Sequence, residues 1–224
     1  MNRTAILFTL VSILILSFRS DKPAYNLYDS EGKNIKYEKM LDRISSADVV
    51  FFGELHDNPI AHWLEYEVTA DLHKIAGERL VLGAEMFEAD NQLLLDEYLG
   101  SEYEADKFEA EVKLWKNYRT DYRPLVEFAK KSSLPFIATN VPRRYASMVS
   151  RGGFEELDSL SAEAKKYLAP LPVSYDPELK CYKDMLSMHG MPGMGARPNQ
   201  NLPKAQAIKD ATMAHFIAEN LPSG

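Results

Sequence analysis

Three short apolar runs constrain the fold of this chain more than any other feature. They lie at residues 49–53 (VVFFG), 80–84 (LVLGA) and 134–139 (LPFIAT). Each run is continuous and rich in β-branched or aromatic residues, which is typical of strands covered on both faces. Because helical patterns separate the runs, we predict an α/β domain with a mostly parallel central sheet flanked by helices.

The helical patterns carry their own start and stop signals. After the first run, Asp57 and Asn58 can cap a helix, an apolar stripe follows, and Gly77 ends it. On the side opposite this stripe, His62 and His73 are expected to face solvent. The domain is also expected to carry an inserted helical lid. Further helices are predicted at residues 92–99, 103–115, 122–131, 177–188 and 204–219, with helical pieces across 141–175.

The two ends of the chain carry separate expectations. Residues 5–18 are almost entirely apolar and follow a short basic start. This run is shorter than the roughly twenty residues of a membrane span, so we interpret residues 1–20 as a signal peptide and the protein as exported. An uncleaved membrane anchor is the alternative. Residues 21–224 then form a single domain, which we expect to lack a C-terminal strand, because in this fold class the last helix should lead into one.

The composition argues against several classes of protein. A single cysteine, Cys181, permits no internal disulfide framework, and we interpret it as a packing residue. The net charge of −7, without basic blocks, argues against nucleic-acid binding. The chain has no G-x-S-x-G elbow, P-loop or G-x-G-x-x-G fingerprint, which argues against serine hydrolases, nucleotide hydrolases and dehydrogenases.

Polar side chains follow each predicted strand, and ligands of open parallel sheets bind beyond the carboxyl ends of the strands. Glu54 and His56 alternate in an extended segment, so both should point to one side. With a second carboxylate they could hold a divalent cation or act as a general base and its orienting partner; an ordinary ion pair is the alternative. The candidates after the three runs are Glu54 and His56, then Glu85, then Arg143, Arg144 and Tyr145.

An ordered set of motifs runs along the chain. The first lies in residues 51–58 (FFGELHDN), and the others are residues 83–87 (GAEMF), 121–125 (DYRPL), 138–146 (ATNVPRRYA) and 205–214 (AQAIKDATMA). With a GExH-like signature in the first segment, the set resembles the ChaN-like haem-binding uptake family across about residues 45–220. This family belongs to a superfamily with the Tiki metalloproteases, TraB proteins and erythromycin esterases.

The resemblance implies an exported bacterial protein of iron acquisition, periplasmic or associated with the outer membrane. It implies that haem is bound through a tyrosine in a pocket shared across a homodimer, with an outer-membrane haem receptor as a possible partner. The chain departs from the family pattern in two ways. It has no lipobox cysteine, and it stops before the position of the second histidine motif of the superfamily.

Two tyrosines are candidate axial ligands, because tyrosinate favours ferric iron. Tyr145 lies beside Arg143 and Arg144 and is the first choice, and Tyr122 lies beside Arg123. His189, within a methionine-rich and glycine-rich segment, could belong to a flap over a flat apolar ligand. His56 and Glu54 complete the expected cofactor site.

Two other interpretations remain open. In a divalent-metal hydrolase, Glu54, His56 and Glu85 would position metal and water, and Arg144 would stabilise an oxyanion. In a partner-binding domain of a lipid surface, the methionine-rich segment would form the contact. Binding of haem alone would require no catalysis, so enzymatic activity is not the first expectation.

Overall fold

The computed structural model describes residues 23–188 and 199–221 of the chain. The predicted signal peptide, residues 1–20, and His189 with its methionine-rich neighbours lie outside the described residues. The chain divides into two compact units, Met1–Leu64 and Glu65–Gly224, and the division falls within helix α3 (Pro59–Ala76).

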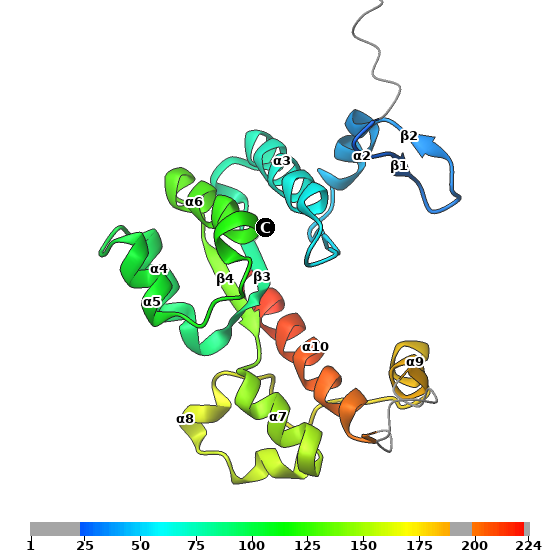
Figure 1. Ribbon diagram of the computed structural model, residues 1–224, viewed down its shortest axis with the longest axis vertical. Coiled ribbons are helices and arrows are strands. Elements are labelled where there is room, and N and C mark those ends of the chain that lie inside the picture. The colour runs from blue at the N-terminus through cyan, green and yellow to red at the C-terminus, as the bar shows by residue number, and fades with distance from the viewer. Residues whose placement is uncertain (1–22, 189–198, 222–224) are drawn as a thin grey trace, which may run out of the picture. The chain divides into compact units, whose positions relative to one another are not determined.

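The first unit contains a short hairpin and a helix. Strands β1 (Leu27–Tyr28) and β2 (Asn34–Ile35) pair antiparallel, and helix α2 (Tyr37–Ile44) follows (Figure 1). The turn between the strands is held by Asp29, whose Oδ1 accepts hydrogen bonds from the backbone N–H groups of Glu31 (3.1 Å) and Lys33 (2.9 Å). Gly32 adopts a φ of 76°, a left-handed conformation that favours glycine.

The predicted strand at residues 49–53 is wrong. The described structure assigns no strand to this segment, although it is as apolar as the other two runs. A strand needs a hydrogen-bonded neighbour, and the described residues of the first unit form no sheet other than β1–β2. Apolar β-branched composition therefore does not by itself produce a strand here.

The second unit is built on a parallel pair of strands, β3 (Leu82–Glu88) and β4 (Phe136–Asn140). The parallel pairing of the second and third apolar runs is confirmed, and both strands begin two residues after the start of their runs. The register matches Ala84 with Ala138 and then Glu88 with Asn140, so β3 advances by four residues over the stretch in which β4 advances by two. This bulge bends the carboxyl end of β3.

Helices surround this pair of strands, as the α/β prediction requires, and the predicted helices are found, most of them with shifted ends. Helix α10 packs against β4 and α7, and α4 packs against β4 and α6 (Figure 1). The elements of the second unit after α3 are η1 (Gly77–Arg79), η2 (Ala89–Asn91), α4 (Gln92–Leu99), α5 (Ala105–Glu111), the π turn η3 (Tyr118–Tyr122), α6 (Arg123–Ser132), α7 (Arg143–Gly152), η4 (Phe154–Ser159), α8 (Ala162–Lys165), α9 (Lys180–Met188) and α10 (Leu202–Glu219).

The helix ends follow local chemistry. Helix α6 has a proline in its first turn and ends at Ser133, which adopts a left-handed φ of 53° while its N–H group caps the helix. At α8, the Ser161 side chain accepts a hydrogen bond from the Ala164 N–H at 3.2 Å. Among the described residues, no helix combines the length and the apolar character that crossing a membrane requires.

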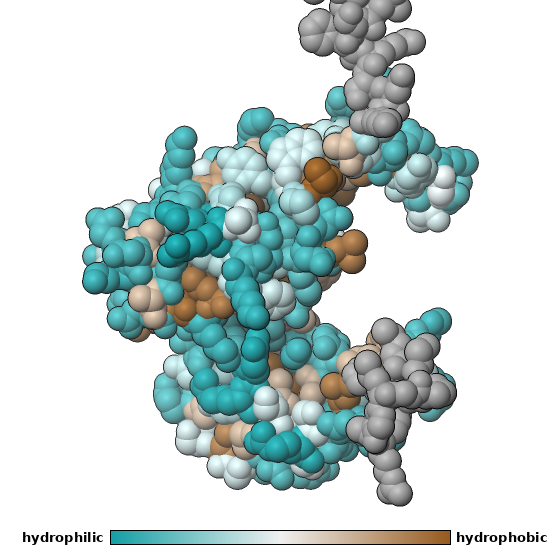
Figure 2. All heavy atoms as spheres, in the orientation of Figure 1, coloured by the Kyte–Doolittle hydropathy of each residue, from teal (hydrophilic) through white to brown (hydrophobic). Residues whose placement is uncertain are grey.

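Two clusters form the core of the second unit. One surrounds the strands and includes Phe87, Phe108 and Phe136, each at most 1% exposed. The helical segment between β4 and α10 forms the other, together with α10, and includes Val149 and Leu157. Most of the visible surface is hydrophilic, with small hydrophobic groups of atoms between (Figure 2), as the 26% charged composition leads one to expect.

Candidate functional site

The carboxyl ends of β3 and β4 lie at the same end of the sheet and bring polar residues together. The side-chain amide of Asn140 donates to the Glu85 carbonyl oxygen across the strands at 3.0 Å. Helix α7 follows β4 beyond this end of the sheet (Figure 1). It begins three residues after β4 ends, with Arg143 and Arg144 as its first residues. The parallel topology therefore places Glu85, Arg143 and Arg144 at the same end of the sheet.

Glu88 fixes the start of α7 to the end of β3. Its Oε2 accepts a hydrogen bond from the Arg143 backbone N–H at 3.0 Å. Its Oε1 lies 3.5 Å from the Lys113 Nζ and 3.9 Å from the Arg143 Nε. A carboxylate at a helix N-terminus is favoured by the exposed N–H groups and the helix dipole, so Glu88 stabilises this junction.

Arg144 joins the carboxylate of Asp90 to the phenol of Tyr145. Its guanidinium hydrogen-bonds to the Asp90 Oδ2 and donates from Nη2 to the Tyr145 hydroxyl oxygen at 3.2 Å. The guanidinium carbon also lies 4.5 Å from the centre of the Tyr145 ring. Burial lowers the pKa of Arg144, but its hydrogen bonds to Asp90 and Tyr145 outweigh this effect and raise that pKa overall. The result is a fixed positive charge at a phenol oxygen.

The two candidate tyrosine ligands belong to different core clusters. Tyr145 is 6% exposed and packs in the cluster of α7 and α10. Tyr122 is 1% exposed, lies in the cluster around the strands and packs edge-to-face against Trp115. The cation next to Tyr122 in sequence, Arg123, instead contacts Glu109 (3.3 Å) and Glu127 (3.4 Å). The Tyr145 hydroxyl contacts the Arg144 guanidinium, which lies beside it in the sequence.

Asn140 also carries an unused acceptor at this end of the sheet. The residue is 8% exposed, and its Oδ1 has no hydrogen-bond partner among the described residues. A buried acceptor without a partner is costly, so a donor from water or from a bound ligand would be favourable here.

A second group of polar side chains lies in the first unit. Glu54 places its Oε1 2.6 Å from the His56 Nδ1 and its Oε2 3.1 Å from the His62 Nδ1. The His62 Nε2 lies 3.2 Å from the His56 carbonyl oxygen, which can only accept, so Nε2 carries a proton in this contact. One carboxylate and two imidazoles are a ligand set suited to zinc and related divalent metals.

The expectation that His62 faces solvent is wrong. Its side chain is 4% exposed. The turn before α3 folds back, and the Asn58 side chain caps the helix by accepting from the Ile60 and Ala61 N–H groups at 3.0 and 3.1 Å. This turn lets His62, in the first turns of α3, reach Glu54. Cys181, expected to pack, is also exposed.

The predicted metal set of Glu54, His56 and Glu85 is divided between the two units, with Glu85 on β3 in the second unit. His62 was expected to face solvent, and neither Glu88 nor Asp90 was among the predicted site residues. The six-residue spacing of His56 and His62 across a capped helix start was a usable signal for His62. The other two depend on the end of β3 and the start of α7 meeting in space.

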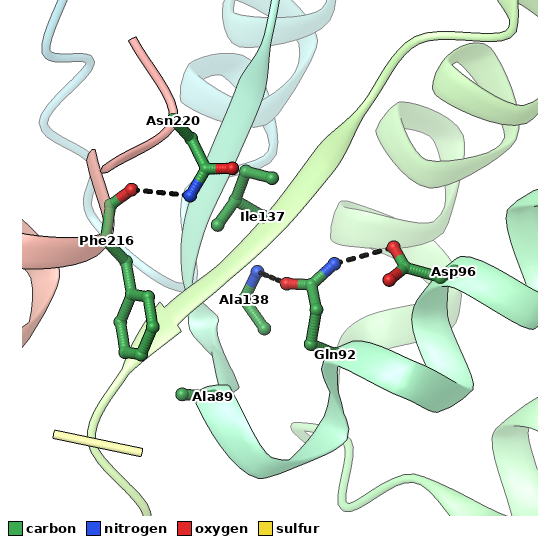
Figure 3. A pocket seen from close by; sticks show the side chains of 7 residues that line it. All are labelled: Ala89, Gln92, Asp96, Ile137, Ala138, Phe216 and Asn220. Carbon is green, nitrogen blue, oxygen red and sulfur yellow. Dashed lines mark hydrogen bonds between the residues drawn. The ribbon is translucent and has the colours of Figure 1, made fainter. Parts of the chain in front are cut away.

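A cavity of about 240 Å³ lies at the edge of β4 that does not pair with β3, and Ala89, between Glu88 and Asp90 in the sequence, is one of its lining residues. Gln92 lies beside Ala138 and Asp96 there, while Phe216 and Asn220 come from the end of α10 (Figure 3). Pockets for drug-sized ligands measure roughly 300–1,000 Å³, so this cavity is too small for haem.

Comparison with known proteins places the chain in a family. The family described as "Haem-binding uptake, Tiki superfamily, ChaN" matches residues 40–224. The fold is similar to the solved structure described as "Cofacial heme binding to ChaN of Campylobacter jejuni", with a TM-score of 0.64 and 20% sequence identity. That match covers 91% of this chain and 78% of the other. None of the curated proteins compared with the chain matches it.

Proposed function

Because the chain belongs to the ChaN family of haem-binding uptake proteins, we propose that it binds haem and serves in bacterial haem and iron uptake. The family match spans most of the chain, and the similar Campylobacter fold is described as binding haem cofacially. Both support a role in holding and handing over haem, which requires no catalysis.

We propose Tyr145 as the axial ligand of ferric haem. The observation that carries this choice is the Arg144 guanidinium on the Tyr145 hydroxyl oxygen. A positive charge at that oxygen favours the anionic phenolate, and phenolate is an accepted ligand of haem iron. Haem itself would supply an Fe(III) centre that accepts this oxygen, with two propionates.

The residues around Tyr145 are also suited to bind the other polar groups of haem. The Arg143 and Arg144 side chains are 63% and 52% exposed and are suited to bind carboxylates such as propionates. The Asn140 Oδ1 offers an acceptor to a water or a ligand. Because both phenols are buried, ligation requires the Tyr145 hydroxyl to become accessible to the iron.

We propose that the protein is exported to the periplasm or the outer-membrane surface, forms a homodimer that shares the haem pocket, and exchanges haem with an outer-membrane receptor. Chromatography with light scattering, with and without haem, tests the dimer. A monomeric mass in both states would contradict it.

A ferric haem titration of the purified protein tests the binding proposal. Tyr145→Phe should weaken binding by at least about tenfold and shift the Soret and charge-transfer bands, because it removes the phenolate oxygen. Tyr122→Phe tests the second candidate. Tyr28→Phe is the control, since Tyr28 is 61% exposed on the hairpin. A wild-type protein that takes up no haem would refute haem binding. Spectra of Tyr145→Phe that equal those of the wild type would show that Tyr145 is not the axial ligand.

A divalent-metal site is the second candidate function, favoured by the contacts of the Glu54 carboxylate with the imidazoles of His56 and His62. In a hydrolase, Glu85 and Arg144 would also have to take part. Zinc titration followed by metal analysis should give about one equivalent bound, and Glu54→Gln should lose it because the carboxylate contacts both imidazoles. Equal zinc content in the wild type and Glu54→Gln would rule this site out.

A further inference from the structure

Asp90 binds the Arg144 guanidinium, which in turn contacts the hydroxyl of Tyr145. It lies in η2, directly after β3, with a side chain 21% exposed. Its Oδ1 accepts from the Asn91 Nδ2 at 3.3 Å, and its Oδ2 binds the Arg144 guanidinium. Both carboxylate oxygens therefore have partners, which fixes the plane of the carboxylate.

The contact matters because Arg144 is long and half exposed. Without a fixed partner, an arginine side chain of this exposure would gain rotamer freedom by moving into water. Its single 3.2 Å hydrogen bond to the Tyr145 hydroxyl and its stacking on the ring would have to oppose that gain alone. A carboxylate anchored at the end of a strand supplies the missing restraint.

The neighbouring contacts make this anchor stiff. Glu88, two residues before Asp90, accepts the Arg143 backbone N–H and so ties the first turn of α7 to the end of β3. Asp90 and Arg144 therefore face each other across a junction that is already fixed by a main-chain hydrogen bond. Side chains supported in this way hold a functional group in place better than side chains on loops.

We propose that Asp90 is a positioning residue, which acts through Arg144 to keep the guanidinium on the oxygen of Tyr145. This inference rests on the proposed role of Tyr145 as a haem ligand. Asp90 would touch neither haem nor iron. Its effect on haem would pass entirely through Arg144, and a double-mutant cycle can separate that effect from a general effect on stability.

The haem-bound protein gives the first test. Asp90→Asn and Arg144→Gln should each speed the transfer of haem to excess apomyoglobin by about tenfold, because each loses a charge-assisted hydrogen bond that supports the phenolate. The double variant should release haem no faster than Arg144→Gln. Asp90→Glu should restore much of the wild-type rate and the charge-transfer band.

Asp71→Asn is the matched control. Asp71 is 24% exposed and pairs with Lys74 at 2.7 Å on α3, so it loses a comparable ion pair away from Tyr145. Its haem transfer rate should equal that of the wild type. Fully multiplicative effects of Asp90→Asn and Arg144→Gln, or a wild-type rate in Asp90→Asn, would overturn the proposal.

The haem-free protein gives a test that does not depend on the proposed function. If Asp90 holds Arg144 on the Tyr145 oxygen, Tyr145→Phe should lower the thermal midpoint less in the Asp90→Asn background than in the wild type. Equal decreases in both backgrounds would overturn the positioning role. Failure of the wild type to bind haem would instead refute the proposed function. The thermal midpoints would still decide whether Asp90 positions Arg144, because they are measured on the haem-free protein.

Discussion

Gln92 supports the fold through its side-chain amide. The amide binds the edge of β4 that does not pair with β3, as the peptide group of a neighbouring strand would. Its Nε2 donates to the Phe136 carbonyl oxygen at 3.0 Å, and its Oε1 accepts from the Ala138 N–H at 2.6 Å. The same Nε2 donates to Asp96 at 2.8 Å (Figure 3). Gln92→Ala should therefore destabilise the second unit.

The magnitude follows from the burial of the two backbone groups. Phe136 and Ala138 are each 1% exposed, and a buried polar group that loses its partner costs about 1–3 kcal/mol. The adjacent cavity of about 240 Å³ can admit water to the vacated positions, which reduces the penalty. We therefore expect each of the two groups to cost about 1 kcal/mol, so that the free energy of unfolding falls by about 2 kcal/mol. For a chain of this length, the thermal midpoint should fall by about 4–8 °C.

Urea unfolding followed by circular dichroism measures the loss, and hydrogen exchange of the Ala138 amide locates it. Gln206→Ala is the control, because the Gln206 Nε2 donates to Asp210 four residues later at the same 2.8 Å. If the two variants differ by less than about 0.5 kcal/mol, and the Ala138 amide stays protected, the assigned role of Gln92 is wrong.

Three further predictions concern the second unit. Burial and the Asp210 carboxylate raise the pKa of Tyr182 to about 12. Because this folded pKa exceeds the unfolded value of about 10, the contribution of Tyr182 to stability is complete below pH 10 and is lost as the pH rises to 12. Tyr182→Phe should therefore flatten the fall of the thermal midpoint over that range; an unchanged slope would contradict this. Thr212→Val should cost about 1–3 kcal/mol in urea unfolding, since the Thr212 Oγ1 accepts from the Ala169 N–H at 3.2 Å, and a neutral result would mean that water replaces it. Leu157→Ala should cost about 2–5 kcal/mol in the same assay, because Leu157 is fully buried in the cluster of α7 and α10; a loss below about 1 kcal/mol would show that the cluster closes around the gap.

The elements of the second unit were largely predictable because their signals are local. The apolar runs that became β3 and β4 are bounded by turn signals, and the helix at Gln92–Leu99 has the predicted limits. Residues 49–53 carry the same composition but form no strand, because pairing depends on a neighbour that composition does not specify. The bulge in β3 was likewise not predictable, since the alternation of apolar and polar residues does not show where the register between two strands shifts.

The gathering of candidate residues at one end of the sheet was predictable, and their side-chain contacts were not. The rule that ligands meet the carboxyl ends of strands placed Glu85, Arg143 and Arg144 at one end of the sheet. Which arginine contacts a phenol depends on side-chain directions in the first turn of α7, and the partnership with Asp90 joins residues 54 positions apart. Contacts of that separation are decided by tertiary structure.

The bulge between Ala84 and Glu88 separates two kinds of constraint along β3. Residues before it are tied to β4 by the regular ladder, and Phe87 within it is fixed by the core at 1% exposure. Glu85 is held by neither constraint to the same degree. A substitution at Glu85 should therefore disturb the strand pairing less than one within the ladder, so this position can be varied to test whether its side chain takes part in the proposed site.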